Sequence, residues 1–429
     1  MIEGNLNHNF CLKDLGYSNY SDSIELPRHR WYYFKEGFSP ILVEKAIEDA
    51  SYGRDDIVVD HFSGSGTAHL VATSYGLQGI GFEVNPFLVF LSRTKLIQLD
   101  PNIIDKKITF IEKGISTGRE SSLEGISTFS KRKKAEKWLF NTSVLRGFEG
   151  GWHNTLYLEK EVRSIFQLAL LGAAMDTCNA TRDGKCLRYR PDWQELNFTK
   201  KVFLNNFLSR IAIIKEDLEK NTIEANKSKI ISGDSRKNFK ENLPLKFKLC
   251  VTSPPYLNSF DYSDIYRPEL FLGKFLSSNK QLTSLRLKTI RSHVQAKWEN
   301  PKQKEFGLLY DEAVRQITER SGLLWNKRIP MMIQAYFEDM SKLLRVLRQR
   351  AERNASLWLI VSTSAYVGVE IPVDLIIAEI GVKVGWFLRE IGVLRYLRAS
   401  NQFSSQYSES SGRRLRESVI IFDASIKKA

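Results

Sequence analysis

A short β-branched run that ends in a glycine-containing turn constrains the fold of this chain more than any other stretch. The run Ile57–Asp60 is apolar up to its final acid, and Gly64 and Gly66 follow shortly after it. The stretch Ala68–Ala72 is again largely apolar, and Gly76 can end it as a helix. The pattern predicts a strand, a loop and a helix in direct succession, which is a building unit of α/β sheets.

The glycine turn after this strand suits the binding of a ligand. Glycines at Gly64 and Gly66 let a ligand approach the backbone, and the N-terminus of the following helix favours electron-rich groups. A dinucleotide site would require the pattern Gly-x-Gly-x-x-Gly, and His69 stands where the third glycine would be. The dinucleotide fingerprint is therefore absent.

A second acid stands at the end of the next expected strand. That strand is Gly79–Glu83, and Asn85 and Pro86 end it. In Rossmann-like folds an acid about 20 residues after the glycine turn binds ribose hydroxyls. We therefore expect Glu83 to bind a ribose, with a solvated strand end as the alternative.

A rigid turn follows an apolar run in the second half of the chain. The run Phe247–Val251 leads through Thr252 into Ser253, Pro254, Pro255 and Tyr256. Prolines have no backbone N–H to donate, so the carbonyls before and at the first proline are free to accept from a group outside the sheet. Acceptors beside the flat ring of a tyrosine suit a planar group that carries an amino substituent. An ordinary turn at a strand end is the alternative.

These two regions resemble the amino-methyltransferases of DNA, which methylate cytosine N4 or adenine N6. The turn after Thr252 is similar to their catalytic motif, in the Ser-Pro-Pro-Tyr form most often seen in the cytosine-N4 group; adenine-N6 enzymes more often carry Asp or Asn first. The stretch Asp60–Thr67 resembles their S-adenosylmethionine loop. The pattern Phe-x-x-x-Phe-Ser-Pro, which begins at Phe34, resembles their segment beside the cofactor; an aromatic patch on the core is the alternative.

The resemblance implies a fold and a set of site residues. The fold is α/β, a Rossmann-like class I methyltransferase fold whose mostly parallel twisted sheet carries helices on both faces and a largely helical insertion. An acid at the end of a further strand, Asp234, resembles the position that contacts the cofactor's adenine. The implied catalytic residues are Ser253, Pro254, Pro255 and Tyr256. The implied residues for S-adenosylmethionine are Phe34, Asp60, Phe62, Gly64, Gly66, Thr67, Glu83 and Asp234.

The implied chemistry uses no covalent intermediate. Ser253 Oγ and the carbonyl of Pro254 would accept hydrogen bonds from the target amine and favour a pyramidal nitrogen. Tyr256 would stack on a base that has left the duplex. Cytosine-C5 methylation would require a nucleophilic cysteine, typically in a Pro-Cys pair, and the sequence has no such pair.

The chain is expected to divide into three parts. These are residues 1–99 with the cofactor loop, a helical insertion over residues 100–225, and residues 226–429 with the catalytic loop. The insertion is the first candidate for target recognition, because the closing strands are expected to leave only a few residues at the C-terminus for another domain. It also contains the basic clusters Lys131–Lys134 and Arg182–Arg190, which suit a nucleic-acid surface. The polar and basic segment 281–305 is the second candidate. A solvated basic surface is the alternative for each.

The C-terminal part is expected to complete the sheet. The apolar runs Leu357–Val361, Val382–Leu388 and Arg416–Phe422 are predicted strands. The serine-rich stretch Asn401–Arg414 is expected to be a mobile loop.

The charge of the chain favours a polyanionic partner. Lys and Arg number 63 against 49 Asp and Glu, for a net charge of +14. Contacts of such side chains with phosphates release counterions. Together with the resemblance, this predicts double-stranded DNA as the substrate, with a cognate restriction endonuclease that acts on the same site as a further partner.

The cysteine and hydropathy patterns point to an intracellular protein without a metal site. The four cysteines form no Cys-x-x-Cys pair, which argues against zinc and is consistent with reduced thiols in the cytoplasm. The sequence has no run of 18 or more apolar residues and no apolar signal core at its N-terminus, so no membrane span is expected.

The expected function is site-specific methylation of cytosine N4 in DNA, as the modification enzyme of a restriction-modification system. Adenine-N6 methylation by the same fold is the first alternative. An RNA or protein methyltransferase of the same architecture is the second, and a DNA-binding protein that has lost catalysis is the third.

Overall fold

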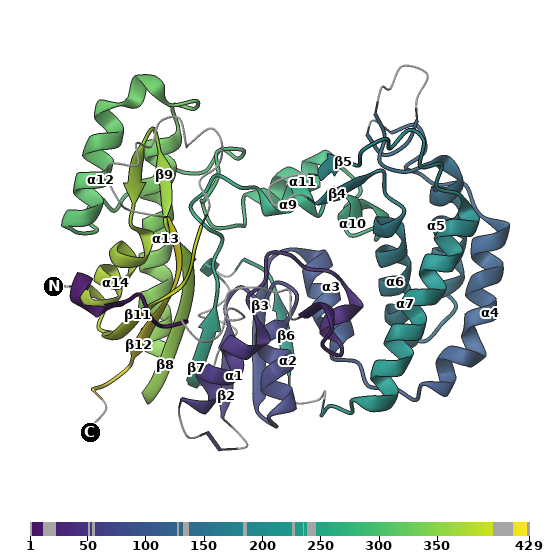
Figure 1. Ribbon diagram of the computed structural model, residues 1–429, viewed down its shortest axis with the longest axis horizontal. Helices are drawn as coiled ribbons and strands as arrows, with labels where there is room; N and C mark the ends of the chain where they lie inside the picture. The colour runs from purple at the N-terminus through teal and green to yellow at the C-terminus, as the bar shows by residue number, and fades with distance from the viewer. Residues whose placement is uncertain are drawn as a thin grey trace.

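A single eight-stranded sheet forms the centre of the computed structural model (Figure 1). The structure describes residues 2–11, 23–49, 52–53, 56–126, 128–131, 137–182, 187–224, 228–234, 236–237, 246–397 and 415–426. The strands of the sheet are β1 (Leu6–Asn7), β2 (Ile57–Asp60), β3 (Gln78–Glu83), β6 (Lys229–Ser232), β7 (Phe247–Thr252), β8 (Ala351–Ser362), β11 (Phe387–Tyr396) and β12 (Arg416–Asp423). Two small antiparallel pairs stand apart from it, β4 (Ala180–Arg182) with β5 (Leu187–Tyr189) and β9 (Ser364–Tyr366) with β10 (Val369–Ile371).

The strand order is β1-β11-β12-β8-β7-β2-β3-β6, and the sheet is mostly parallel. Only β12, among the described strands of this sheet, runs antiparallel to its neighbours, β8 and β11. The first strand along the chain after β1 is β2, and it lies in the interior between β3 and β7. The order therefore reverses direction at β2, the kind of switch point where doubly wound folds bind ligands.

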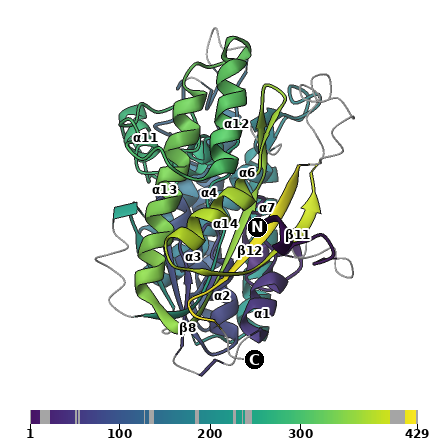
Figure 2. The same ribbon diagram turned by 90° about the vertical axis from the view of Figure 1, so that its left-hand side faces the viewer.

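Helices cover both faces of the sheet. The helices are α1 (Pro40–Glu48), α2 (Thr67–Ser74), α3 (Pro86–Lys95), α4 (Asn102–Thr117), α5 (Thr142–Thr155), α6 (Lys160–Asp176), α7 (Lys200–Lys220), α9 (Tyr262–Ile265), α10 (Arg267–Leu272), α11 (Asn279–Arg286), α12 (Leu308–Glu319), α13 (Ile329–Arg350) and α14 (Val373–Lys383). Figure 2 shows α13 and α14 on one side of the strands and α1 on the other. The predicted Rossmann-like α/β class is confirmed.

The strands bury both faces through the two-residue period of extended chain. Val58, Leu249 and Val251 pack with α1 and α2 on one face. Their neighbours Val59 and Cys250 pack with α13 and α14 on the other. Because both faces are covered, these strands read as continuous apolar runs rather than as alternating ones.

The helices α4 to α7 form a bundle beside the sheet, at the right of Figure 1. Their core includes Phe148, Phe166 and Phe207, and it continues into Phe87 of α3 and into Trp31 before α1. The largely helical insertion predicted from the sequence is therefore present, and it is attached to the catalytic part through apolar packing. The division into residues 1–99, 100–225 and 226–429 remains a prediction.

One predicted strand, Val382–Leu388, begins too early and ends too early. Val382 and Lys383 still belong to α14, and β11 begins only at Phe387 and runs to Tyr396. Residues 357–361 and 416–422 are in strands, as predicted. The stretch Asn401–Arg414, expected to be a loop, lies outside the described residues.

No helix in the described ranges is long and apolar enough to cross a membrane.

Candidate active site

The carboxyl ends of three neighbouring parallel strands meet at one edge of the sheet. β2 ends at Asp60, β3 at Glu83 and β7 at Thr252. The pairing places β2 between the other two. The glycine loop and the Ser-Pro-Pro-Tyr turn, which are far apart in the sequence, therefore leave the sheet side by side.

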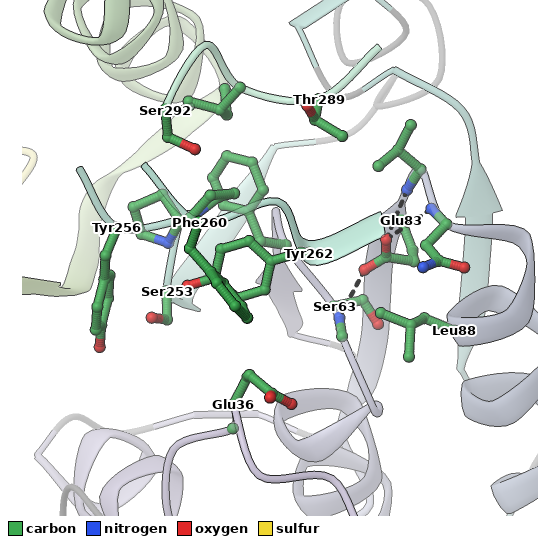
Figure 3. Close-up of a pocket in the computed structure, with 18 of the residues that line it drawn as sticks. Glu36, Ser63, Glu83, Leu88, Ser253, Tyr256, Phe260, Tyr262, Thr289 and Ser292 are labelled. Carbon is green, nitrogen blue, oxygen red and sulfur yellow. Dashed lines mark hydrogen bonds between the residues drawn. The ribbon is translucent and has the colours of Figure 1, made fainter. Parts of the chain in front are cut away.

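A pocket of about 320 Å³ opens between them (Figure 3). Figure 3 shows Tyr256 and Ser253 at one side of the pocket and Glu83 at the other. The predicted site residues that line it are Phe34, Phe62, Gly64, Thr67, Glu83, Ser253, Pro254, Pro255 and Tyr256. Three predicted residues, Asp60, Gly66 and Asp234, are not part of its lining.

The glycine loop has the backbone that its sequence predicts. Gly64 has φ 50° and Gly66 has φ 90°, both in the left-handed region that favours glycine. A Cβ on Gly64 would lie 3.1 Å from the ring of Phe34, and one on Gly66 would lie 2.6 Å from Nε2 of His69. Gly64 thus lets the aromatic segment close over the loop, whereas Gly66 serves the packing of the helix start.

Glu83 is bound on both oxygens by backbone amides. Oε2 accepts from Gly64 N at 2.8 Å, and Oε1 accepts from Val84 N at 2.9 Å and from Asn85 N at 2.8 Å. Figure 3 marks these bonds with dashed lines. Burial raises the pKa of Glu83 to about 7, while the amide bonds act in the opposite direction. The amides hold the carboxylate at the pocket wall, where its remaining lone pairs can accept from hydroxyl groups.

Asp60 connects the glycine loop to the end of β7. Its Oδ1 accepts from Thr252 Oγ1 at 2.8 Å and from Phe62 N at 3.0 Å. Burial raises the pKa of Asp60 to about 7. Its Oδ2 is buried without a hydrogen-bond partner in the described part of the chain. Asp60 therefore sets the distance between the two loops from behind the pocket.

Tyr256 is held by the last two strands. Its hydroxyl donates to Glu417 Oε1 of β12 at 2.5 Å, and Arg395 of β11 lies 2.8 Å from Glu417 Oε2. Burial and the adjacent Glu417 raise the pKa of Tyr256 well above its usual range. Arg395 and Glu417 both line the pocket. No motif in the sequence indicated them, since they follow the turn by more than 130 residues.

Sequence reasoning also missed the aromatic and polar wall opposite the glycine loop. Phe260 and Tyr262 line the pocket with their ring centroids 4.6 Å apart. Lys288, Thr289 and Ser292 line it from the segment 281–305. Part of the second candidate for target recognition therefore lies at the pocket itself.

Asp234 lies outside the pocket. Its carboxylate is bound by the guanidinium of Arg236, at 3.0 Å and 2.8 Å. Arg236 also lies 3.6 Å from Asp339. A contact between Asp234 and an adenine would require this pair to separate, and the role of Asp234 remains a prediction.

Several basic residues of the expected nucleic-acid surfaces make internal contacts. Arg182 pairs with the buried Glu269, and Arg190 donates to the carbonyl of Cys178 at 2.8 Å. In the segment 281–305, Arg291 pairs with Asp339. By contrast, Lys288 and Lys297 are exposed. The residues Arg132–Lys134 and Asp183–Cys186 lie outside the described ranges.

Comparison with known proteins supports a relation to the type II methyltransferases. The chain is 24% identical over 448 residues to type II methyltransferase M.BsoBI of Geobacillus stearothermophilus, covering 92% of this chain and 85% of that protein. It is 25% identical over 448 residues to type II methyltransferase M.AvaI of Anabaena variabilis, covering 92% of this chain and 86% of that protein. With type II methyltransferase M.MvaI of Kocuria varians it shares 26% identity over 268 residues, which is 57% of this chain and 56% of that protein.

No family model matches the sequence. Among solved structures, the rRNA methyltransferase aviRa from Streptomyces viridochromogenes matches with 11% identity and a TM-score of 0.30, covering 99% of this chain and 93% of that chain. A score this low supports no conclusion about the present chain. The similarity to type II methyltransferases, in contrast, extends over nearly the whole length.

Proposed function

We propose that this chain is a site-specific DNA methyltransferase that transfers a methyl group from S-adenosylmethionine to the N4 amine of cytosine. The observation that carries the proposal is the shared pocket, which brings the glycine loop at Gly64 and the strand-end acid Glu83 together with Ser253 and Tyr256. A cofactor loop alone, or a proline turn alone, would support much less.

The pocket fits a nucleoside with an amino-acid tail. Gly64 has a backbone that only glycine adopts readily, and Glu83 presents a fixed acceptor for ribose hydroxyls. Phe34, Phe62 and Thr67 complete this side of the pocket. Asp60 and Gly66 act from behind by shaping the loop, and Asp234 remains the proposed adenine contact. When bound, S-adenosylmethionine supplies an activated methyl group.

The catalytic turn provides hydrogen-bond acceptors toward the target amine. The lone pair of cytosine N4 is delocalised into the ring, which makes the amine a poor nucleophile. Ser253 Oγ and the carbonyl of Pro254 would accept its N–H groups and favour a pyramidal nitrogen. Transfer would form the N4–methyl bond as the sulfur–methyl bond breaks, which leaves S-adenosylhomocysteine, and one proton would pass from N4 to solvent. Holding both reactants in line would supply much of the rate.

The target base must leave the duplex to reach this turn. Tyr256 would stack on the displaced base, and its hydrogen bond to Glu417 fixes the orientation of the ring before the base arrives. A side chain that is already ordered loses less entropy when the base binds.

The proposed polymer is double-stranded DNA, within a restriction-modification system. The relatives are named type II methyltransferases. The net charge of +14 is consistent with binding to a phosphate backbone. We propose that the chain acts in the cytoplasm and protects sites that a partner endonuclease cleaves.

Product analysis tests the proposal. The purified protein is incubated with methyl-labelled S-adenosylmethionine and unmodified bacterial DNA, and the DNA is digested to nucleosides for mass spectrometry. We expect labelled N4-methylcytosine, less of it with Ser253→Ala at short times, and none with RNA as the substrate. Labelled N6-methyladenine would assign the adenine reaction instead. No labelled base from any DNA would contradict the enzymatic proposal.

A further inference from the structure

Glu36 presents an incompletely paired carboxylate to the pocket. It lies in the segment between Phe34 and α1, and it lines the pocket. Its Oε2 accepts from the hydroxyl of Tyr266. Its Oε1 is buried and has no hydrogen-bond partner among the described residues. In Figure 3 the Glu36 side chain points into the pocket from the side opposite Thr289 and Ser292.

The surroundings hold this carboxylate in place. The ring of Tyr266 stacks on that of Phe34, with centroids 5.7 Å apart and an angle of 13° between the planes. The guanidinium of Arg182 lies 4.6 Å from the centroid of the Tyr266 ring. Tyr266 is fully buried. Its hydroxyl is therefore a fixed donor to one oxygen of Glu36, and this bond also fixes the direction of the other oxygen.

An unpaired buried carboxylate oxygen costs free energy unless a ligand completes it. Burial raises the pKa of Glu36, against the effects of Tyr266 and Arg182, which lower it. A carboxylate in this setting gains most from a cation that also donates hydrogen bonds. An ammonium group meets both requirements, because it carries a positive charge and three N–H donors.

The location of Glu36 indicates which part of the ligand it meets. The ring of Phe34 lies against Gly64, so the segment that carries Glu36 closes over the glycine loop. In Figure 3 Glu83, which is assigned to the ribose, lies apart from Glu36. The neighbouring Lys35 also lines the pocket, so the segment offers one negative and one positive side chain. Such a pair matches the ammonium and carboxylate of an α-amino acid.

Building on the proposed function, we infer that the Glu36 carboxylate binds the α-ammonium group at the amino-acid end of the cofactor. Asp60 also has an unpaired buried oxygen, but its side chain does not line the pocket. Glu36 therefore determines preference for ligands that carry a free α-amino group.

Three ligands separate this role from other roles of the carboxylate. S-adenosylmethionine carries the ammonium and a sulfonium, S-adenosylhomocysteine carries the ammonium alone, and 5′-methylthioadenosine carries neither. Each is titrated by calorimetry into wild-type protein and Glu36→Gln, which keeps an acceptor for Tyr266. Glu48→Gln is the matched control, since Glu48 also accepts from a tyrosine hydroxyl, that of Tyr75, at the exposed end of α1.

We expect Glu36→Gln to lower the affinity for S-adenosylmethionine and for S-adenosylhomocysteine by the same factor. The factor should be about tenfold or more, for the loss of a charge-assisted hydrogen bond. Binding of 5′-methylthioadenosine, and all binding by Glu48→Gln, should not change. Weaker binding of S-adenosylmethionine alone would place the carboxylate at the sulfonium. Equal effects on the binding of all three ligands, or no effect on any, would make its role structural. Each of these results overturns the inference. Failure of the wild-type protein to bind any of them would instead overturn the proposed function, and the inference with it.

Discussion

The hydroxyl of Tyr256 lies 2.5 Å from Oε1 of Glu417, and this hydrogen bond joins the Ser-Pro-Pro-Tyr turn after β7 to β12 near the other end of the chain. Arg395 on β11 pairs with the same carboxylate. The ring of Tyr256 is therefore oriented by two strands that follow the motif residues in the sequence and complete the sheet. The hydroxyl and the ring of Tyr256 therefore have different roles, since the hydroxyl is bound by Glu417 and the ring is proposed to stack on the base.

Tyr256→Ala should remove the stacking surface for the displaced base. Base stacking on an aromatic ring is worth about 1–3 kcal/mol. We expect kcat/KM for DNA to fall by about 5- to 150-fold, with the affinity for S-adenosylmethionine nearly unchanged in calorimetry. Tyr256→Phe is the control, because it keeps the ring and loses only the hydroxyl, with its bonds to Glu417 and Ser253. It should retain more activity than the alanine variant. Equal losses in the two variants would contradict a stacking role.

Ser253→Ala should lower turnover and leave cofactor binding intact. The hydroxyl is proposed to accept a hydrogen bond from the target amine during methyl transfer, and an interaction that matters in the transition state appears in kcat. A net hydrogen bond of about 1 kcal/mol corresponds to a loss of about fivefold, and a stronger one to more. Single-turnover rates with saturating cofactor measure the effect. Ser284→Ala, on the exposed face of α11, is the control and should have the wild-type rate. An unchanged rate for Ser253→Ala would show that Ser253 has no part in the mechanism.

Gly64→Ala should weaken cofactor binding through the ring of Phe34. The new Cβ would lie 3.1 Å from that ring and push the aromatic segment away from the loop. Gly76→Ala is a matched control, since Gly76 also has positive φ, at 71°, and nothing lies within 4 Å of its Cβ position. Both variants should lose about 1–2 kcal/mol of stability from the left-handed backbone. Only Gly64→Ala should also lose affinity for S-adenosylmethionine, and equal affinities in the two variants would contradict the assignment of the loop.

The contributions of Glu83 and Asp60 to the free energy of unfolding should fall as the pH rises from about 4 to about 7. Burial raises the pKa of Glu83 to about 7 and that of Asp60 to about 7. An acid whose pKa is higher in the folded state binds more protons when folded, so neutralisation stabilises the fold below the folded pKa and the contribution is lost as the pH rises toward it. Urea unfolding of the ligand-free protein at several pH values measures the slope. The buried His29 and His69, whose pKa burial lowers to about 3, contribute a slope of the opposite sign. Glu83→Gln should therefore make the slope more positive than in the wild-type protein, and an unchanged slope would contradict a raised pKa of Glu83.

Charge reversal of Lys288, at the pocket, and of Lys297, in the same segment, should weaken DNA binding. Lys288 and Lys297 are exposed, and Lys288 lines the pocket. For each phosphate that a variant no longer neutralises, the slope of log affinity against log salt should become shallower by about 0.9. Lys383→Glu on α14 is the control, an exposed lysine outside both candidate segments. Fluorescence anisotropy at several salt concentrations would detect the change. If only variants within residues 100–225 alter sequence preference, that insertion reads the bases, and Lys288 and Lys297 do not.

Local sequence patterns predicted the parts of the site that depend on local backbone geometry. The glycines at Gly64 and Gly66 adopt positive φ because few other residues do so at low cost, and this property is visible in the sequence. The prolines at 254 and 255 interrupt a strand for a similarly local reason. The apolar runs of β2 and β7 predicted buried strands, and parallel pairing then brought their ends together.

The same kind of pattern failed where an apolar run has no period. The run around Val382 is apolar enough for a strand or a buried helix, and it continues α14 because that helix packs on the sheet beside α13. Periodicity alone cannot separate these cases. The surrounding layers decided between them.

The sequence by itself determined the fold class, the glycine loop, the strand-end acid Glu83 and the turn at Ser253, since each rests on a residue type at a short spacing. Only the tertiary structure decided that Glu417 holds Tyr256, that Glu36 faces the pocket, and that Asp234 is paired with Arg236. The first two arrangements depend on contacts between positions 161 and 230 residues apart, between Tyr256 and Glu417 and between Glu36 and Tyr266. Such contacts leave no periodic or local trace in a sequence, because the free energy that forms them comes from packing of whole elements rather than from neighbouring residues.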